Sequence, residues 1–64
     1  MCEATAYLLN KSGQEELYLA DVDLIEPQED GTLRLVSIYG EQKTLAGRIK
    51  SMSLVNHRVV LAER

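Results

Sequence analysis

Short runs of alternating apolar and polar residues extend along the whole chain, and an alternation with a period of two predicts β-strands. In the first run, Ala4, Ala6 and Leu8 share one face, while Glu3 and Tyr7 share the other. We expect extended segments over residues 3–9, 15–20, 21–26, 32–39, 42–46, 48–54 and 58–62, with 48–54 continuing the strand that Gly47 interrupts. The segment 21–26 continues the one before it after a bend at Ala20-Asp21.

Turn residues separate these runs at intervals of about ten residues. Gly13 lies in the polar segment 11–14, and Asp30-Gly31 is a strong hairpin-turn pair that follows the break at Pro27. Gly40-Glu41 and the segment 55–57 supply two further turns. Gly47 falls inside a strand pattern, which is typical of a bulge or of a sharp bend at a barrel corner.

This pattern predicts an all-β fold, a small closed or partly open β-barrel of five to six short antiparallel strands. Closure would remove the exposed edge strands that promote aggregation. In the segment 32–39 we expect Leu33, Leu35 and Ser37 to share one face. In the segment 48–54 we expect Ile49, Met52 and Leu54 to point inward.

The composition points to a small and thinly filled core. The 64 residues correspond to one domain, 1–64, with neither Phe nor Trp and with a single Cys, which excludes an internal disulfide. Small domains without disulfides or structural metals often gain the missing burial by association. We therefore expect a homodimer, and a two-fold axis could bring two copies of Cys2 together.

The charge distribution argues against nucleic acid as a partner. The net charge is −3 at pH 7 and the charges are spread along the chain, whereas a nucleic-acid-binding surface needs clustered Lys and Arg. No apolar run approaches the length of a membrane span, and no basic-then-apolar leader precedes the domain. A cytoplasmic location is expected.

Cys2 is the main candidate for chemistry. A thiolate is a soft ligand that suits thiophilic metals, and at position 2 it lies close to a nitrogen donor, the α-amine if Met1 is removed or a deprotonated backbone amide if Met1 stays. Nitrogen and thiolate donors together favour nickel or copper over calcium or magnesium. Glu3 could add a carboxylate or a backbone donor, or simply face solvent. The alternative is that Cys2 is a small apolar residue without a ligand role.

The remaining polar residues favour structural interpretations. His57 could act as a second ligand, but we interpret it as a turn residue. Tyr7, Tyr18 and Tyr39 are interpreted as core or dimer-interface residues, and the acidic segment 26–30 as a solvated loop without calcium-loop spacing. No Cys-hydrolase signature is present, and a domain of this size has little room for a catalytic pocket, so we do not expect an enzyme.

Four motifs in order along the chain are similar to the CooT family. They are Met1-Cys2-Glu3-x-Thr5-Ala6-Tyr7-Leu8, Tyr39-Gly40-Glu41-Gln42-Lys43, Gly47-Arg48-Ile49-Lys50 and Leu54-Val55-x-His57-Arg58-Val59-Val60-Leu61. Each motif is short, and their order together with the chain length makes the resemblance specific.

The resemblance implies a cytoplasmic homodimer of small β-barrels that binds Ni(II) through Cys2 and assists nickel insertion into a client enzyme such as carbon monoxide dehydrogenase. It does not make His57 a ligand. Two other hypotheses stay open. One is an RNA-binding barrel with a basic face formed by Arg34, Arg48, Lys50 and Arg58. The other is a hydrogenase-maturation chaperone of the HypC kind, which also begins Met-Cys.

Overall fold

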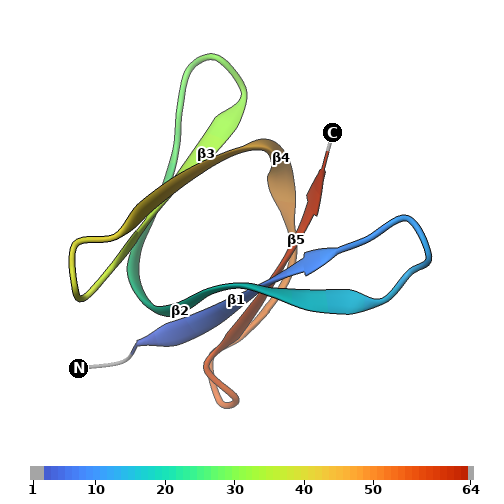
Figure 1. Ribbon diagram of the computed structural model, residues 1–64, viewed down its shortest axis with the longest axis horizontal. Helices are drawn as coiled ribbons and strands as arrows, with labels where there is room; N and C mark the ends of the chain where they lie inside the picture. The colour runs from blue at the N-terminus through green and yellow to red at the C-terminus, as the bar shows by residue number, and fades with distance from the viewer. Residues whose placement is uncertain (1–2, 64) are drawn as a thin grey trace.

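The computed structural model describes residues 3–63, and its five strands follow the predicted alternation (Figure 1). The strands are β1 (Ala4–Leu9), β2 (Glu15–Pro27), β3 (Thr32–Ser37), β4 (Gln42–Ser53) and β5 (Arg58–Glu63). They form a closed barrel in the order β1-β2-β3-β4-β5, which confirms the predicted fold class.

The closing contact joins the first strand to the last. Each strand pairs with the next in antiparallel orientation, but β1 and β5 pair in parallel, from Thr5 opposite Arg58 to Leu9 opposite Ala62. The closing pair therefore depends on contacts between residues more than fifty positions apart, and it leaves neither terminal strand as an open edge of the sheet.

Neither Asp21 nor Gly47 ends its strand, since β2 continues through Asp21 and β4 continues through Gly47. Asp21 has a positive φ of 56°, and the register of β2 against β3 shifts between Val22 and Leu24. At Gly47 a Cβ atom would collide with the backbone carbonyl of Ala62, so only glycine allows β4 and β5 to approach this closely. Because β2 and β4 both continue through these positions, the barrel has five strands and not six.

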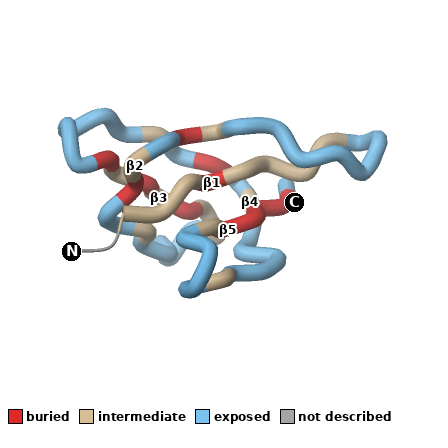
Figure 2. The backbone as a smooth tube through the Cα atoms, turned by 90° about the horizontal axis from the view of Figure 1, so that it is seen from below, coloured by how far each residue is buried: buried red, intermediate tan, exposed pale blue. Residues whose placement is uncertain are grey.

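The core lies inside the barrel (Figure 2) and follows the inward faces of the alternation. Its buried cluster consists of Ala6, Leu19, Val22, Leu33, Leu35, Leu45, Val59 and Leu61. Ala4 and Leu8 pack against it, and Ser37 is buried with Leu33 and Leu35, as their positions in the alternation predict.

One predicted inward face is wrong. Ile49, Met52 and Leu54 are exposed, with Leu54 at 79%, and the β4 residue that enters the core is Leu45. The register of β4 against β5 shifts between Ile49 and Ser51, and the β4–β5 hairpin then extends beyond the end of the barrel (Figures 1 and 2). The pairing of β4 with β3 ends at Ala46, so the later residues of β4 have β5 as their only paired neighbour among the described strands.

Three of the hairpins use the same turn. In the segments 10–14, 28–32 and 37–41, the first amide donates to the last carbonyl at 2.8, 2.8 and 2.9 Å. The fourth residue of each is a glycine, Gly13, Gly31 or Gly40, with φ between 84° and 87°. A left-handed backbone at this position needs a residue without a Cβ, which explains the predicted turn glycines.

Candidate functional site

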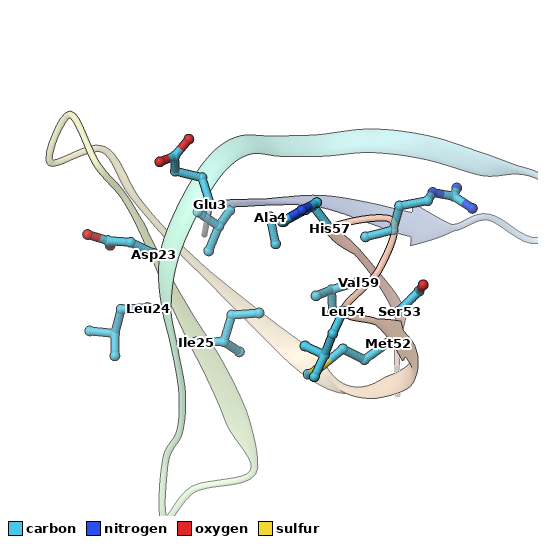
Figure 3. Close-up of a pocket in the computed structure, with 12 residues that line it drawn as sticks. Glu3, Ala4, Asp23, Leu24, Ile25, Met52, Ser53, Leu54, His57 and Val59 are labelled. Atoms are coloured by element: carbon cyan, nitrogen blue, oxygen red, sulfur yellow. The ribbon is translucent and has the colours of Figure 1, made fainter. Parts of the chain in front are cut away.

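A pocket of about 380 Å³ lies at one mouth of the barrel (Figure 3). It is bounded by the start of β1, the second half of β2, the end of β4 and the start of β5. Its lining residues are Glu3, Ala4, Val22, Asp23, Leu24, Ile25, Met52, Ser53, Leu54, His57, Arg58 and Val59.

The pocket walls are mostly apolar, and the polar groups lie around the rim. Figure 3 shows the side chains of Ile25, Met52, Leu54 and Val59 gathered about the hollow, while the carboxyl groups of Glu3 and Asp23 point outward. An apolar hollow with a few charged groups at its edge can bind an apolar side chain or ligand and orient it through the rim.

Of the two predicted site residues, the structure describes Glu3. Glu3 is half-buried and lines the pocket, whereas Cys2 lies outside the described residues. Because Cys2 directly precedes Glu3, the pocket rim is the described region closest along the chain to the predicted metal ligand. The sequence alone gave no sign that the N-terminal segment borders a pocket.

Within residues 3–63 no group of three or more His, Cys, Asp and Glu side chains is placed to hold a metal ion. Glu3 and His57 both line the pocket, but two such groups do not complete a coordination sphere.

His57 is a turn residue, as predicted, and its backbone has the strained conformation of the fourth hairpin. It has a φ of 54°, close to the region that glycine occupies in the other three hairpins, and its carbonyl accepts a hydrogen bond from the Thr5 amide at 2.8 Å. This bond joins the β4–β5 hairpin to β1 where the parallel pairing begins. The sequence places His57 in a turn but does not reveal its position in the pocket wall.

Replacing His57 by glycine is expected to raise the free energy of unfolding by about 1 kcal/mol, because glycine removes the strain of a left-handed backbone. Urea denaturation of His57→Gly and of the wild type measures the difference. His57→Ala, which keeps the strain and also lacks the imidazole, is the matched control. If the glycine variant were no more stable than the alanine variant, the strain at this position would be negligible.

The basic face proposed for RNA is partly used in ion pairs. Arg34 pairs with Glu26 at 2.8 Å, and Arg58 pairs with Glu15 and lies over the Tyr7 ring at 4.5 Å from its centroid. The hydrogen bond from Arg58 to Glu15 raises the pKa of the guanidinium further. Arginines already held by carboxylates are poor counterions for phosphate, so this pairing weighs against the RNA hypothesis.

Tyr18 and Tyr39 differ in their burial. Tyr18 packs against the core and Lys43 lies over its ring at 4.7 Å, while burial and the nearby Glu63 raise the pKa of the Tyr18 hydroxyl. Tyr39 is 79% exposed at the tip of the β3–β4 hairpin. Tyr18 therefore confirms the structural interpretation, and Tyr39 is not a core residue.

The fold and the pocket define a small closed β-barrel with an apolar pocket at one mouth, and comparison with known proteins gives its family. The family model of the carbon monoxide dehydrogenase accessory protein CooT matches residues 1–62. A crystal structure described as a candidate CooT from Carboxydothermus hydrogenoformans superposes with a TM-score of 0.87 and 41% sequence identity, covering 98% of both chains. A search among curated proteins finds no match.

The chain belongs to the CooT family of carbon monoxide dehydrogenase accessory proteins. This confirms the resemblance inferred from the four sequence motifs. The family description is that of an accessory protein, so a client enzyme is its expected partner. Among residues 3–63 no helix is long and apolar enough to cross a membrane.

Proposed function

We propose that this protein binds Ni(II) through the Cys2 thiolate and the N-terminal nitrogen and delivers it during the maturation of a nickel enzyme such as carbon monoxide dehydrogenase. In this proposal two protomers share one Ni(II), each contributing a nitrogen and a sulfur donor. The observation that carries the proposal is the family match, which begins at residue 1 and therefore includes Cys2.

The donor chemistry supports nickel as the cargo. Nickel(II) forms planar complexes with nitrogen donors and thiolates, and a thiol next to the chain terminus offers both in one chelate ring. Two protomers related by a two-fold axis would supply two such rings. Together the rings contain two nitrogen and two sulfur donors, which complete a square-planar site. The client enzyme would receive the metal from ligands at the end of a chain and not from a closed protein cage.

Nickel affinity is expected to rise with pH, because metal binding displaces the proton of the thiol. Below the thiol pKa, near 8.5 for an ordinary cysteine, each displaced proton contributes about a tenfold gain in affinity per pH unit. If both thiols of a dimer bind one metal ion, the dependence is correspondingly steeper.

Replacing Cys2 by serine is expected to abolish nickel binding while the barrel stays folded. The test is a titration of Ni(II) into protein whose N-terminus has been checked by intact mass, followed by thiolate-to-metal absorption. The wild type should saturate at one nickel per two chains. A folded Cys2→Ser variant that kept full nickel affinity would contradict the proposal.

Glu3→Gln serves as the companion variant at the neighbouring position. The amide keeps the size and the backbone of Glu3 but removes the charge of the carboxylate. Unchanged nickel affinity in Glu3→Gln would limit the role of residue 3 to its backbone, and a clear loss would make the carboxylate a ligand. In either case the variant shows whether the effect of Cys2→Ser is specific to the thiolate.

A further inference from the structure

We propose that the tip of the β3–β4 hairpin, residues 37–41, is a docking site for an arginine-bearing segment of a partner protein, with the exposed ring of Tyr39 as its anchor (Figure 1). This inference goes beyond the proposed function, because it assigns a surface for a protein partner and does not depend on nickel binding. Ile38, Tyr39 and Glu41 do not line the pocket at the barrel mouth, so the tip is a separate surface.

The three hairpins that share one turn geometry differ in the side chains at their tips. The second and third residues of the turn are Lys11-Ser12, Glu29-Asp30 and Ile38-Tyr39, and the same two backbone hydrogen bonds close each turn. The first two pairs are polar, as is usual for turn residues in solvent. The turn geometry is therefore compatible with polar residues at these positions, and it does not account for Ile38-Tyr39.

The Tyr39 side chain gains little from the fold of its own chain. Tyr39 is 79% exposed and the neighbouring Ile38 is 40% exposed. An aromatic side chain buries about 150–250 Å² when it is covered, so a ring left in water forgoes a large apolar contribution. Tyrosine and arginine are enriched among the residues that carry most of the binding energy of protein interfaces. An exposed Ile-Tyr pair at a hairpin tip thus has the character of an interface anchor.

The turn holds Tyr39 in a fixed position. The hydroxyl oxygen of Ser37, a buried residue, accepts hydrogen bonds from the Tyr39 and Glu41 amides, each at 3.2 Å. The Ile38 amide donates to the carbonyl of Asp21 in β2 at 2.8 Å, so the tip is joined to the barrel wall as well as to its own hairpin. A backbone that is already ordered lowers the entropy lost when an anchor residue binds.

The charges near the tip favour a basic partner. Glu41 ends the turn, and Asp21 accepts the hydrogen bond that joins the tip to β2. Within residues 3–63 neither carboxylate forms an ion pair or a side-chain hydrogen bond. Lys43 is close along the chain, but its ammonium group donates to the Tyr18 carbonyl at 2.8 Å. The net charge of −3 also attracts cationic surfaces.

Arginine is the cation that fits both the ring and the carboxylates. Its planar guanidinium stacks on an aromatic face while its N–H groups donate to carboxylate oxygens. The barrel itself contains this arrangement, because Arg58 lies over the Tyr7 ring at 4.5 Å from its centroid and pairs with Glu15. At the hairpin tip the chain provides the ring and the carboxylates, and a partner would supply the arginine. Such a segment would belong to the client enzyme expected for the family.

The test is an NMR titration of the metal-free, isotope-labelled full-length protein with a capped peptide that carries two arginines between glycines. The matched control peptide carries citrulline, which has the shape of arginine but lacks its charge. The ring signals of Tyr39 and the amide signals of residues 38–41 are expected to shift saturably with the arginine peptide. The dissociation constant should be at least about fivefold lower than for the citrulline peptide. No saturable shift at the tip, or equal binding of both peptides, would overturn the docking site.

Tyr39→Ser removes the anchor without disturbing the turn, since Ser12 occupies the equivalent position of the first hairpin. This variant is expected to bind the arginine peptide at least about fivefold more weakly. Glu41→Gln should weaken binding about twofold. Glu29→Gln removes the same charge from another hairpin tip and should have no effect. Equal losses in Glu41→Gln and Glu29→Gln would mean that the peptide follows the net charge, and the site would be wrong.

Sedimentation velocity and nickel titration of Tyr39→Ser separate this inference from the proposed function. Loss of peptide binding with an unchanged oligomeric state and unchanged nickel affinity supports the docking site. A Tyr39→Ser variant that dissociates into monomers, while the wild type is dimeric, overturns it, because Tyr39 would then contact a second copy of the chain. A wild type that does not bind nickel overturns the nickel proposal alone, since the peptide titration uses metal-free protein.

Discussion

Replacing Leu61 by alanine is expected to leave the protein largely unfolded at 25 °C. Leu61 is fully buried in β5, where it lies opposite Leu8 of β1 and Ile49 of β4 in the pairing register. A buried Leu→Ala substitution costs about 3–5 kcal/mol, through lost transfer free energy and the cavity that remains. A domain of this size rarely has more than about 5 kcal/mol in total.

Urea denaturation followed by circular dichroism measures the effect, with all proteins at one fixed concentration because association shifts apparent stability. Leu17→Ala is the matched control. It removes the same atoms from a residue that is 65% exposed, and it should change the unfolding free energy by less than about 0.5 kcal/mol. Similar losses in the two variants would mean that the core is not centred where the barrel places it.

Replacing Gly47 by alanine is expected to lower the free energy of unfolding by about 3 kcal/mol. The added Cβ would collide with the carbonyl oxygen of Ala62 and lie 3.2 Å from its carbonyl carbon. These are backbone atoms of β5, so no side-chain rotation can relieve the contact. The two strands must separate, and the pairing of Gly47 with Glu63 is lost.

Gly40→Ala is the control for this substitution, because it separates a steric clash from backbone strain. Gly40 has open space around its Cβ position but a φ of 87°, so alanine there is expected to cost about 1–2 kcal/mol through strain alone. Thermal and urea denaturation of both variants should show Gly47→Ala as the more destabilised. The reverse order would contradict the close contact between β4 and β5.

The alternation of apolar and polar residues determined most of the secondary structure. Ala4, Ala6 and Leu8 face the core because successive side chains of a strand point to opposite sides, and this holds whatever the topology. The turn glycines were also predictable, since Gly13 and Gly31 occupy left-handed positions that other residues rarely adopt. Local geometry was sufficient for these features.

For the candidate site, the sequence determined which donor atoms are available but not which residues form the pocket beside them. The donor types of Cys2 and Glu3 follow from residue identity, and the family motifs assign the role to Cys2. The pocket could not be predicted, because it joins Glu3 to residues of β2, β4 and β5 that are distant along the chain. Periodicity also assigned Met52 and Leu54 to the core, since a pattern of two faces does not show where a strand passes the end of the barrel.

Only the tertiary structure decided how the barrel closes. The parallel pairing of β1 with β5 requires the sheet to curve until its first and last strands meet. Asp21 has a left-handed backbone in β2 and Gly47 lies against the backbone of Ala62, but which strands these residues meet is decided by pairings between distant parts of the chain. Residue types therefore fixed the strands, the turns and the donor atoms, whereas contacts between distant strands fixed the closure, the pocket and the exposed hairpin beside it.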